Sequence, residues 1–169
     1  MPRRLIVGVM GGGAVDRRTA ELAYRLGSLI ADAGWVLLNG GRNCGVMAAS
    51  ARGARERGGL TVGVLPDADR RQAAPWIDVA IVTGMGSARN AINVLSSDVV
   101  VACAGGAGTL SEIALALKAG KTVILLDFDV RGAFAGQAAA GRLLLAATPE
   151  EAVAEIRRLY EAAPQSPPD

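Results

Sequence analysis

The chain has 169 residues, of which 51% are hydrophobic and 20% charged, a composition typical of one globular domain rather than of a disordered chain. A formal net charge of +2 and an aromatic content of 4% argue against a nucleic-acid-binding surface. No apolar run reaches the roughly 18 residues that a membrane span requires. We therefore expect no nucleic acid and no membrane as partners. Two distant cysteines, Cys44 and Cys103, indicate reduced thiols and a cytoplasmic location.

Apolar runs that suit buried strands alternate with segments of helical periodicity along the chain. We expect strands at residues 5–10, 35–38, 60–65, 77–82, 98–103 and 121–127, with a last short strand at 143–146. We expect helices between Asp16 and Gly34, at 44–57, 88–95 and 109–119, and from Thr148 onward. Residues 66–75 are predicted to form a polar loop, and the pattern leaves the form of residues 128–142 open.

Capping signals mark the starts of two of these helices. Asp16 is an N-cap candidate, and Thr148, Pro149 and Glu151 have the pattern of a capping box with proline at the first helical position. The last helix is expected to bury Val153, Ile156 and Tyr160. The helix at 109–119 is expected to bury the apolar residues Leu110, Ile113, Ala114 and Leu117.

The alternation of strands and helices predicts an α/β fold. We expect a three-layer Rossmann-like domain whose central, mostly parallel sheet of about six to seven strands carries helices on both faces. The sequence shows no internal repeat and no second domain. Residues 1–162 are predicted to form this single domain, and residues 163–169, which include three prolines, a disordered tail.

Three glycine-rich loops, at residues 8–13, 39–47 and 104–109, follow predicted strands and precede predicted helices. In an open parallel sheet, ligands bind beyond the carboxyl ends of the strands. Glycine lets a ligand touch the main chain, and a helix N-terminus offers free N–H groups and partial positive charge. We therefore predict a phosphate site, with ordinary strand-to-helix turns as the alternative. The candidate contacts are Gly11, Gly12, Gly40, Gly41, Arg42, Asn43, Gly45, Gly105, Gly106, Gly108 and Thr109.

Two familiar nucleotide-binding fingerprints do not fit. An NAD site needs a clean Gly-x-Gly-x-x-Gly and an acidic residue after the second strand, where this chain has Asn39. Gly120 and Lys121 resemble the end of a P-loop, but Leu115 stands where the first glycine belongs and a strand follows. We interpret this segment as a helix end with an ordinary lysine.

The sequence contains no histidine, and this absence narrows the catalytic and metal-binding chemistry that the protein can perform. Cys-His and Ser-His-Asp catalysis are excluded, as are most zinc sites, and we expect no metal site. Cys44 stands near a predicted helix start, which favours a thiolate, but it lacks a base. Asp127 and Asp129 are predicted to be solvated acids at a strand end rather than magnesium or ribose ligands.

The glycine-rich loops resemble the signatures of the LOG family of the SLOG superfamily, also known as lysine decarboxylase-like proteins. Residues 105–112 resemble its Pro-Gly-Gly-x-Gly-Thr-x-x-Glu signature, and residues 40–47 its Gly-Gly-x-x-x-Gly-x-Met loop. The similarity extends over residues 5–126. The segment from Arg89-Asn90 through residues 97–101 to Gly105-Gly106 is similar to the branch of molybdenum cofactor carrier proteins and their bacterial homologues.

The resemblance implies roles for two charged residues. LOG enzymes hydrolyse the N-glycosidic bond of nucleoside 5′-monophosphates, and Glu112 and Arg89 match their glutamate and arginine. A carboxylate can stabilise a sugar with oxocarbenium-like positive charge, and a guanidinium can bind a phosphate. Without such roles, Glu112 is a carboxylate favoured by the helix dipole and Arg89 a surface residue. Ala104 replaces the signature proline, and Asn90 stands where LOG enzymes usually carry lysine, which favours binding over hydrolysis.

We therefore expect a carrier that needs no cofactor of its own and holds a small phosphorylated ligand, either a nucleoside monophosphate or the molybdopterin-type molybdenum cofactor. Arg89, Asn90 and Glu112 join the glycine loops as its candidate ligand contacts. One alternative is a phosphoribohydrolase with Glu112 and Arg89 as catalytic residues. Another is an interaction domain that only keeps the fold. The family resemblance further implies a homodimer or homotetramer.

Overall fold

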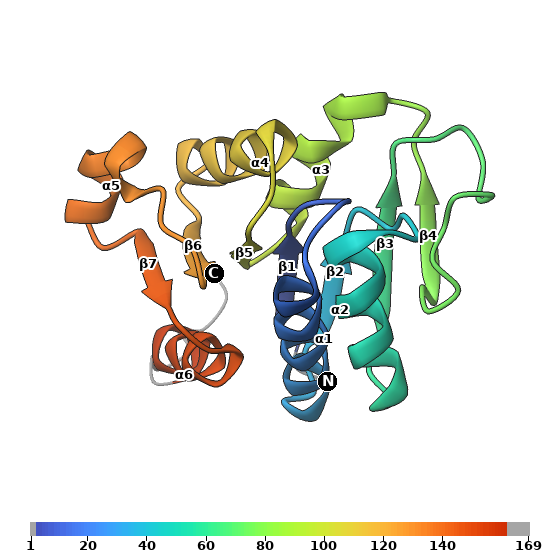
Figure 1. Ribbon diagram of the computed structural model, residues 1–169, viewed down its shortest axis with the longest axis horizontal. Helices are drawn as coiled ribbons and strands as arrows, with labels where there is room; N and C mark the ends of the chain where they lie inside the picture. Colours follow the sequence, from blue (N-terminus) through green and yellow to red (C-terminus); the bar gives the residue numbers. More distant parts are fainter. Residues whose placement is uncertain (1–2, 162–169) are drawn as a thin grey trace.

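The computed structural model describes residues 3–161, and within this range seven strands form one all-parallel sheet in the order β4-β3-β2-β1-β5-β6-β7 (Figure 1). The strands are β1 Ile6–Met10, β2 Val36–Asn39, β3 Thr61–Leu65, β4 Val79–Val82, β5 Val99–Cys103, β6 Thr122–Leu126 and β7 Leu143–Ala146. The α/β class and the Rossmann-like sheet predicted from the sequence are confirmed.

Helices connect most consecutive strands, as expected for right-handed parallel crossovers, whereas a loop without a helix joins β3 to β4. The helices are α1 Arg17–Asp32, α2 Gly45–Glu56, α3 Arg89–Ser96, α4 Ala107–Lys118, α5 Ala135–Ala139 and α6 Pro149–Tyr160. Short 3-10 helices cover Gly86–Ala88 and Arg131–Phe134, so the segment 128–142 that the pattern left open is helical in part. Among the residues described, no helix has the length and apolar character needed to cross a membrane. The proposed tail at 163–169 lies outside the described residues.

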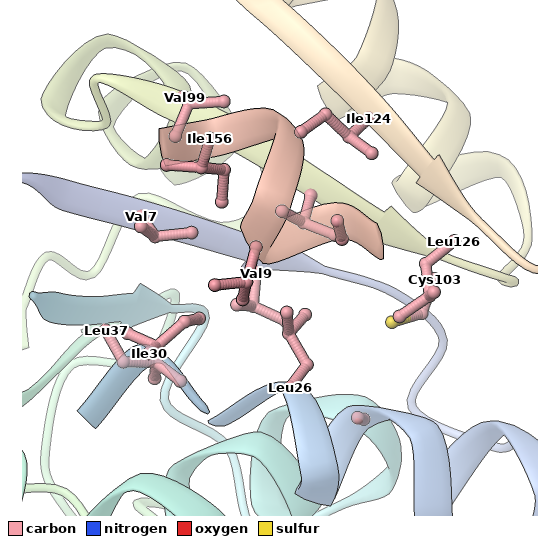
Figure 2. Close-up of a cluster of buried hydrophobic side chains, with 14 of the residues drawn as sticks. Val7, Val9, Leu26, Ile30, Leu37, Val99, Cys103, Ile124, Leu126 and Ile156 are labelled. Atoms are coloured by element: carbon pink, nitrogen blue, oxygen red, sulfur yellow. The ribbon is translucent and has the colours of Figure 1, made fainter. Parts of the chain in front are cut away.

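Alternating side chains of the strands feed two cores, one on each face of the sheet. On one face, Val7, Val9 and Val101 pack with residues of α1, α2 and α6; Figure 2 shows this cluster, including Leu26, Ile30 and Ile156. On the other face, Met10, Val100 and Ala102 pack with residues of α3 and α4. The helices therefore form the two outer layers of a three-layer structure.

The predicted helix starts are present. The Asp16 carboxylate accepts a hydrogen bond from the Thr19 backbone N–H at 2.8 Å, and Thr148 Oγ1 accepts one from the Glu151 N–H at 3.2 Å. The Glu151 side chain differs from the usual capping box, because it accepts from the backbone N–H of Ala147, one residue before the cap, at 2.7 Å. These bonds satisfy N–H groups that a helix start leaves without partners.

The predicted apolar face of α4 is confirmed at Ile113 and Leu117, which are buried, and wrong at the other two residues, because Leu110 is 41% exposed and Ala114 is exposed. Thr109, Glu112 and Ala116 complete the buried side. Apolar residues surround most of this helix, so periodicity alone does not fix the inward side. Packing against the sheet and α3 turns two polar residues inward instead. On α6, Tyr160 is 37% exposed, and its hydroxyl donates to the Asp98 carbonyl at 2.8 Å.

The strand order reverses between β1 and β5, which are hydrogen-bonded neighbours. From β1 the chain builds outward through β2, β3 and β4, and from β5 it builds the other way through β6 and β7. The loops after β1 and β5 therefore diverge to opposite faces of the sheet. Such a switch point leaves a crevice at the carboxyl ends of the strands, where ligands of open α/β sheets bind.

Candidate functional site

A cleft of about 360 Å³ lies at this switch point, within the size range of small-molecule sites (~300–1,000 Å³). Ten of the predicted contacts line it: Gly11, Gly12, Gly40, Arg42, Arg89, Asn90, Gly106, Gly108, Thr109 and Glu112. Its walls also contain residues that the sequence analysis did not select, namely Val9, Met10, Gly13, Met47, Pro66, Gly86 and Ser87. The fold thus gathers segments from across most of the chain into one cavity.

Backbone hydrogen bonds join the three glycine-rich loops to one another. The Gly12 N–H donates to the Ala104 carbonyl at 3.1 Å, and the Gly12 carbonyl accepts from the Val46 N–H at 3.0 Å. The loop after β1 is therefore held between the loop after β5 and the start of α2. This fixes the main chain that lines the cleft before any ligand binds.

Asn39, at the end of β2, holds the second glycine loop from beneath. It is fully buried, its Oδ1 accepts from the Gly41 N–H at 2.8 Å, and its Nδ2 donates to the Met47 carbonyl at 2.9 Å and to Ser50 Oγ at 3.1 Å. A residue at this position reads the ribose in NAD-binding proteins. Here the side chain is fully used by the protein itself.

The candidates Gly41, Asn43, Gly45 and Gly105 do not line the cleft. Gly45 begins α2 with a positive φ of 49°, and a Cβ there would overlap the Gly12 carbonyl. The Asn43 N–H donates to the Gln72 carbonyl at 2.9 Å, and the Gly41 carbonyl accepts from the Ala74 N–H at 2.8 Å. In this structure, these residues shape the loops behind the cleft surface.

Arg42 lies at the rim of the cleft, paired with Asp67 from the loop between β3 and β4. Its Nη2 and Nε donate to the Asp67 carboxylate at 2.6 and 3.1 Å. The bidentate pair raises the pKa of Arg42 and lowers the pKa of Asp67. Because Asp67 neutralises much of its charge, Arg42 presents less positive potential to the cleft than the sequence suggested.

Arg89, the first residue of α3, is half-buried in the cleft wall with its hydrogen-bonding capacity partly unused. Nη1 donates to the Val64 carbonyl at 3.2 Å, and the buried Nε has no partner. The guanidinium lies against Gly40, where a Cβ would overlap Nη1. Burial lowers the pKa of Arg89, yet a guanidinium stays charged at any physiological pH. The cleft therefore contains a partly desolvated cation with free donors.

Glu112 faces the same cleft from the second turn of α4 and is 7% exposed. Its Oε1 accepts a hydrogen bond from Asn93 Nδ2 at 3.0 Å. Burial raises the pKa of Glu112, while the hydrogen bond from Asn93 and the charge of Arg89 oppose that rise. Within residues 3–161 no ion pair of 4.0 Å or less joins Arg89 to Glu112. The cation and the carboxylate act on one another across the cleft without closing it.

Asn93 supports the candidate site by its hydrogen bond to Glu112, and it was not among the residues predicted from the sequence. It is fully buried on α3, four residues after Arg89, a spacing that places two side chains on the same helix face. A polar residue at that spacing from a candidate arginine is the signal that could have revealed it. Neighbouring Asn90 bridges the same two helices, because its Nδ2 donates to Ser111 Oγ at 3.0 Å.

The start of α4 adds main-chain donors to the cleft. The N-cap is Gly106, which has no side chain to cap the first turn, and both Gly106 and Gly108 line the cavity. The first N–H groups of a helix lack intrahelical partners and, with the helix dipole, favour an anion. Together with Arg89, this turn makes the cleft suited to a phosphate.

The other residues singled out in the sequence lie apart from the cleft. Asp127 pairs with Arg18 at 2.7 Å and Asp129 with Arg131 at 2.8 Å. Lys121 Nζ donates to the Ser97 carbonyl at 2.7 Å, at the end of α3. In the described part of the chain, no three His, Cys, Asp or Glu residues gather as metal ligands would.

Two solved structures resemble this fold closely. The molybdenum cofactor binding protein from Rippkaea orientalis superposes with a TM-score of 0.87 and 48% identity, over 93% of this chain and 98% of that one. The molybdenum cofactor carrier protein of Chlamydomonas reinhardtii superposes with a TM-score of 0.87 and 43% identity, over 94% of this chain and 99% of that one. The similarity to this branch that the motifs predicted is confirmed.

Curated relatives include an uncharacterised protein of Archaeoglobus fulgidus, 51% identical over 71% of this chain and 78% of its own length. A cytokinin riboside 5′-monophosphate phosphoribohydrolase of Mycobacterium tuberculosis is 41% identical over 55% of this chain, a match that spans 51% of the enzyme. The SLOG cluster4 family matches residues 4–153. With its all-parallel sheet and its glycine-lined cleft at the switch point, the chain belongs to the SLOG cluster4 family.

Proposed function

We propose that this protein is a carrier that binds a phosphate-bearing ligand of the molybdopterin type in the cleft and holds it without cleaving it. The observation that carries the proposal is the half-buried Arg89 guanidinium in a cavity walled by glycine main chain. A guanidinium that is partly shielded from water attracts an anion more strongly than a fully solvated one, and its planar set of donors matches a phosphate.

The cleft offers two kinds of contact. Arg89 and the first turn of α4 supply donors for phosphate oxygens, whereas Glu112 supplies an acceptor for ring N–H or hydroxyl groups. A pterin phosphate carries both kinds of partner, and so does a nucleoside monophosphate. The similarity to molybdenum cofactor proteins at 43–48% identity favours the pterin.

Binding is tested by mixing the purified protein with molybdenum cofactor and, separately, with AMP, and then by measuring the melting temperature and the ligand retained on gel filtration. We expect a rise in melting temperature and retention of the pterin, because a ligand that binds only the folded state stabilises it. Failure of both ligands to bind would support the interaction domain that only keeps the fold.

A second function, hydrolysis of nucleoside monophosphates, is favoured by one observation. Glu112 and Arg89 both face the cleft without pairing directly, which leaves room for a sugar phosphate between them. The 41% identity to the mycobacterial phosphoribohydrolase points the same way. Incubation with AMP and chromatography of the products tests it. If the wild type releases free base and Glu112→Ala does not, the protein is a hydrolase and the carrier proposal is wrong.

We also infer that the chain forms homodimers or homotetramers. Large apolar side chains are exposed on α3 and α4 and in the loop that precedes α3, with Leu95 of α3 61% exposed, Met85 51% and Leu110 of α4 41%. Such residues favour burial against another subunit. Light scattering after gel filtration gives the subunit number, and a monomer would contradict the inference.

A further inference from the structure

Asn93 is a buried polar residue whose presence packing alone does not explain. Its side chain is fully buried, Nδ2 donates to Glu112 Oε1 at 3.0 Å, and the buried Oδ1 has no partner. Burying an amide whose oxygen has no hydrogen-bond partner costs free energy that an apolar side chain would avoid. The one side-chain partner of Asn93 is the carboxylate in the cleft, so its role concerns Glu112.

The charges around Glu112 come from few groups. Arg89 on α3 is the charged residue that acts on it directly, and across the cleft Arg42, Asp67 and Cys44 act in turn on Arg89. In the empty cleft, Arg89 and the Asn93 amide favour the ionised carboxylate, whereas burial disfavours it. The balance therefore depends on whether the charge of Arg89 remains available to Glu112.

An anion bound at Arg89 changes that balance. It neutralises the guanidinium and places a second negative charge beside a carboxylate that is already poorly solvated. Protonation of Glu112 removes the repulsion. The Asn93 amide suits both states, because a half-turn about its last side-chain bond brings the unpartnered Oδ1 to Glu112, where it accepts the new carboxyl O–H.

We propose that Asn93 is a positioning residue that serves Glu112 in both protonation states, so that binding of an anion at Arg89 is coupled to uptake of one proton by Glu112. The proton comes from solvent, and no bond to the ligand is made or broken. This inference rests on the proposed function, because it requires an anionic group to bind in the cleft.

The first experiment needs no ligand. Carbon-13 NMR follows the Glu112 carboxyl through a pH titration in the wild type and in Asn93→Leu. We expect the pKa of Glu112 to move upward in the variant, because the charge-assisted bond from the amide N–H to the carboxylate is stronger than the neutral bond from the carboxyl O–H to the amide oxygen, so the ionised form loses more. Val94→Ala is the matched control, since Val94 is the next residue of α3 and is 1% exposed. It should reduce stability and leave the Glu112 titration unchanged. An unchanged titration in Asn93→Leu would overturn the role of Asn93.

The second experiment measures the proton directly and uses Glu112→Gln, which keeps an oxygen for Asn93 and therefore folds even if Asn93→Leu does not. Isothermal titration calorimetry with inorganic sulfate, whose charge stays constant from acidic to neutral pH, is run in buffers of different ionisation heat. We expect uptake of about one proton and an affinity that falls up to about tenfold per unit rise in pH. Glu112→Gln should show neither effect.

The outcomes separate the two proposals. Sulfate that binds without proton uptake, or uptake that persists in Glu112→Gln, overturns the coupling and leaves the carrier proposal intact. If sulfate, AMP and molybdenum cofactor all fail to bind, the site does not accept anions, and both the proposed function and the coupling fail.

Discussion

Two helix pairs, one on each face of the sheet, differ in how they treat buried polar groups. Between α1 and α2, the backbones approach closely at Gly27 and Gly53, where a Cβ would overlap the carbonyl of Ser50 or of Tyr24. The buried polar side chains of this pair are satisfied, as Ser28 Oγ donates to the Tyr24 carbonyl at 3.1 Å.

Between α3 and α4, buried polar groups remain partly unsatisfied. Among the residues described, the two buried side-chain atoms without a partner, Arg89 Nε and Asn93 Oδ1, both belong to α3. Large apolar residues of the same pair, Leu95 and Leu110, are exposed instead. Unmet hydrogen bonds are unusual in an otherwise well-satisfied structure, so this contrast fits the proposed division in which α1 and α2 mainly provide stability and α3 and α4 contribute most to the ligand site.

The largest expected effect is on the close-packed pair. Gly53→Ala places a Cβ against the Tyr24 backbone, which cannot move away easily, so we expect a loss of about 3–5 kcal/mol in the free energy of unfolding, measured by urea denaturation. Gly136→Ala in α5 is the matched control, because nothing surrounds a Cβ there. Alanine favours helix, so the control should be neutral or stabilise by up to about 1 kcal/mol. Equal effects at both positions would contradict the packing difference.

The next effect is on ligand binding at the other pair. Arg89→Ala should weaken binding of the phosphate ligand about 100-fold, the equivalent of roughly 3 kcal/mol of charge-assisted hydrogen bonding. The free energy of unfolding should change little, because Arg89 in the wild type already leaves a buried donor, its Nε, without a partner. Arg89→Lys keeps the charge but loses the planar fork of donors, so it should bind with intermediate affinity. Calorimetry measures all three proteins, and unaltered binding by Arg89→Ala would place the ligand elsewhere.

A smaller effect concerns the pH dependence of stability. Burial raises the pKa of Glu112 in the folded protein, so the folded state holds this proton more tightly than the unfolded state. The resulting stability is fully present below the ordinary glutamate pKa and is lost as pH rises through the folded value. Glu112→Gln removes this dependence.

Wild type should therefore lose stability relative to Glu112→Gln as pH rises from about 4 toward neutral, by at most about 1.4 kcal/mol per pH unit. Urea denaturation of both proteins at a series of pH values measures the difference. If the stability of wild type relative to Glu112→Gln stays constant or rises with pH, burial does not raise the pKa of Glu112 and the prediction is wrong.

The smallest effect tests which side of α4 faces inward. Leu110→Ala should change the stability of the isolated subunit by no more than about 0.5 kcal/mol, because the side chain is 41% exposed. Ile113→Ala, on the buried side, should cost about 2–5 kcal/mol. Thermal denaturation at low protein concentration compares the two, and a large loss from Leu110→Ala at that concentration would restore the face expected from periodicity.

The sequence by itself determined the elements and the location of the candidate site. Strand and helix periodicity, the caps at Asp16 and Thr148, and the three glycine-rich loops are local features, and they were sufficient for the sheet and its carboxyl-end cleft. Local signals suffice there because parallel strands with helical crossovers have few arrangements that obey handedness and burial.

Only the tertiary structure decided how the cleft is completed. The pairing of Arg42 with Asp67 and of Asn93 with Glu112 joins residues 25 and 19 positions apart, so no local pattern reveals it. The tertiary structure also decided which glycines line the cavity and which shape the loops behind its surface. On α4, apolar residues lie on several sides, and only contact with α3 and the sheet places Thr109 and Glu112 inward and Leu110 outward. The reason is physical: periodicity gives a helix its faces, whereas its neighbours choose which face is buried.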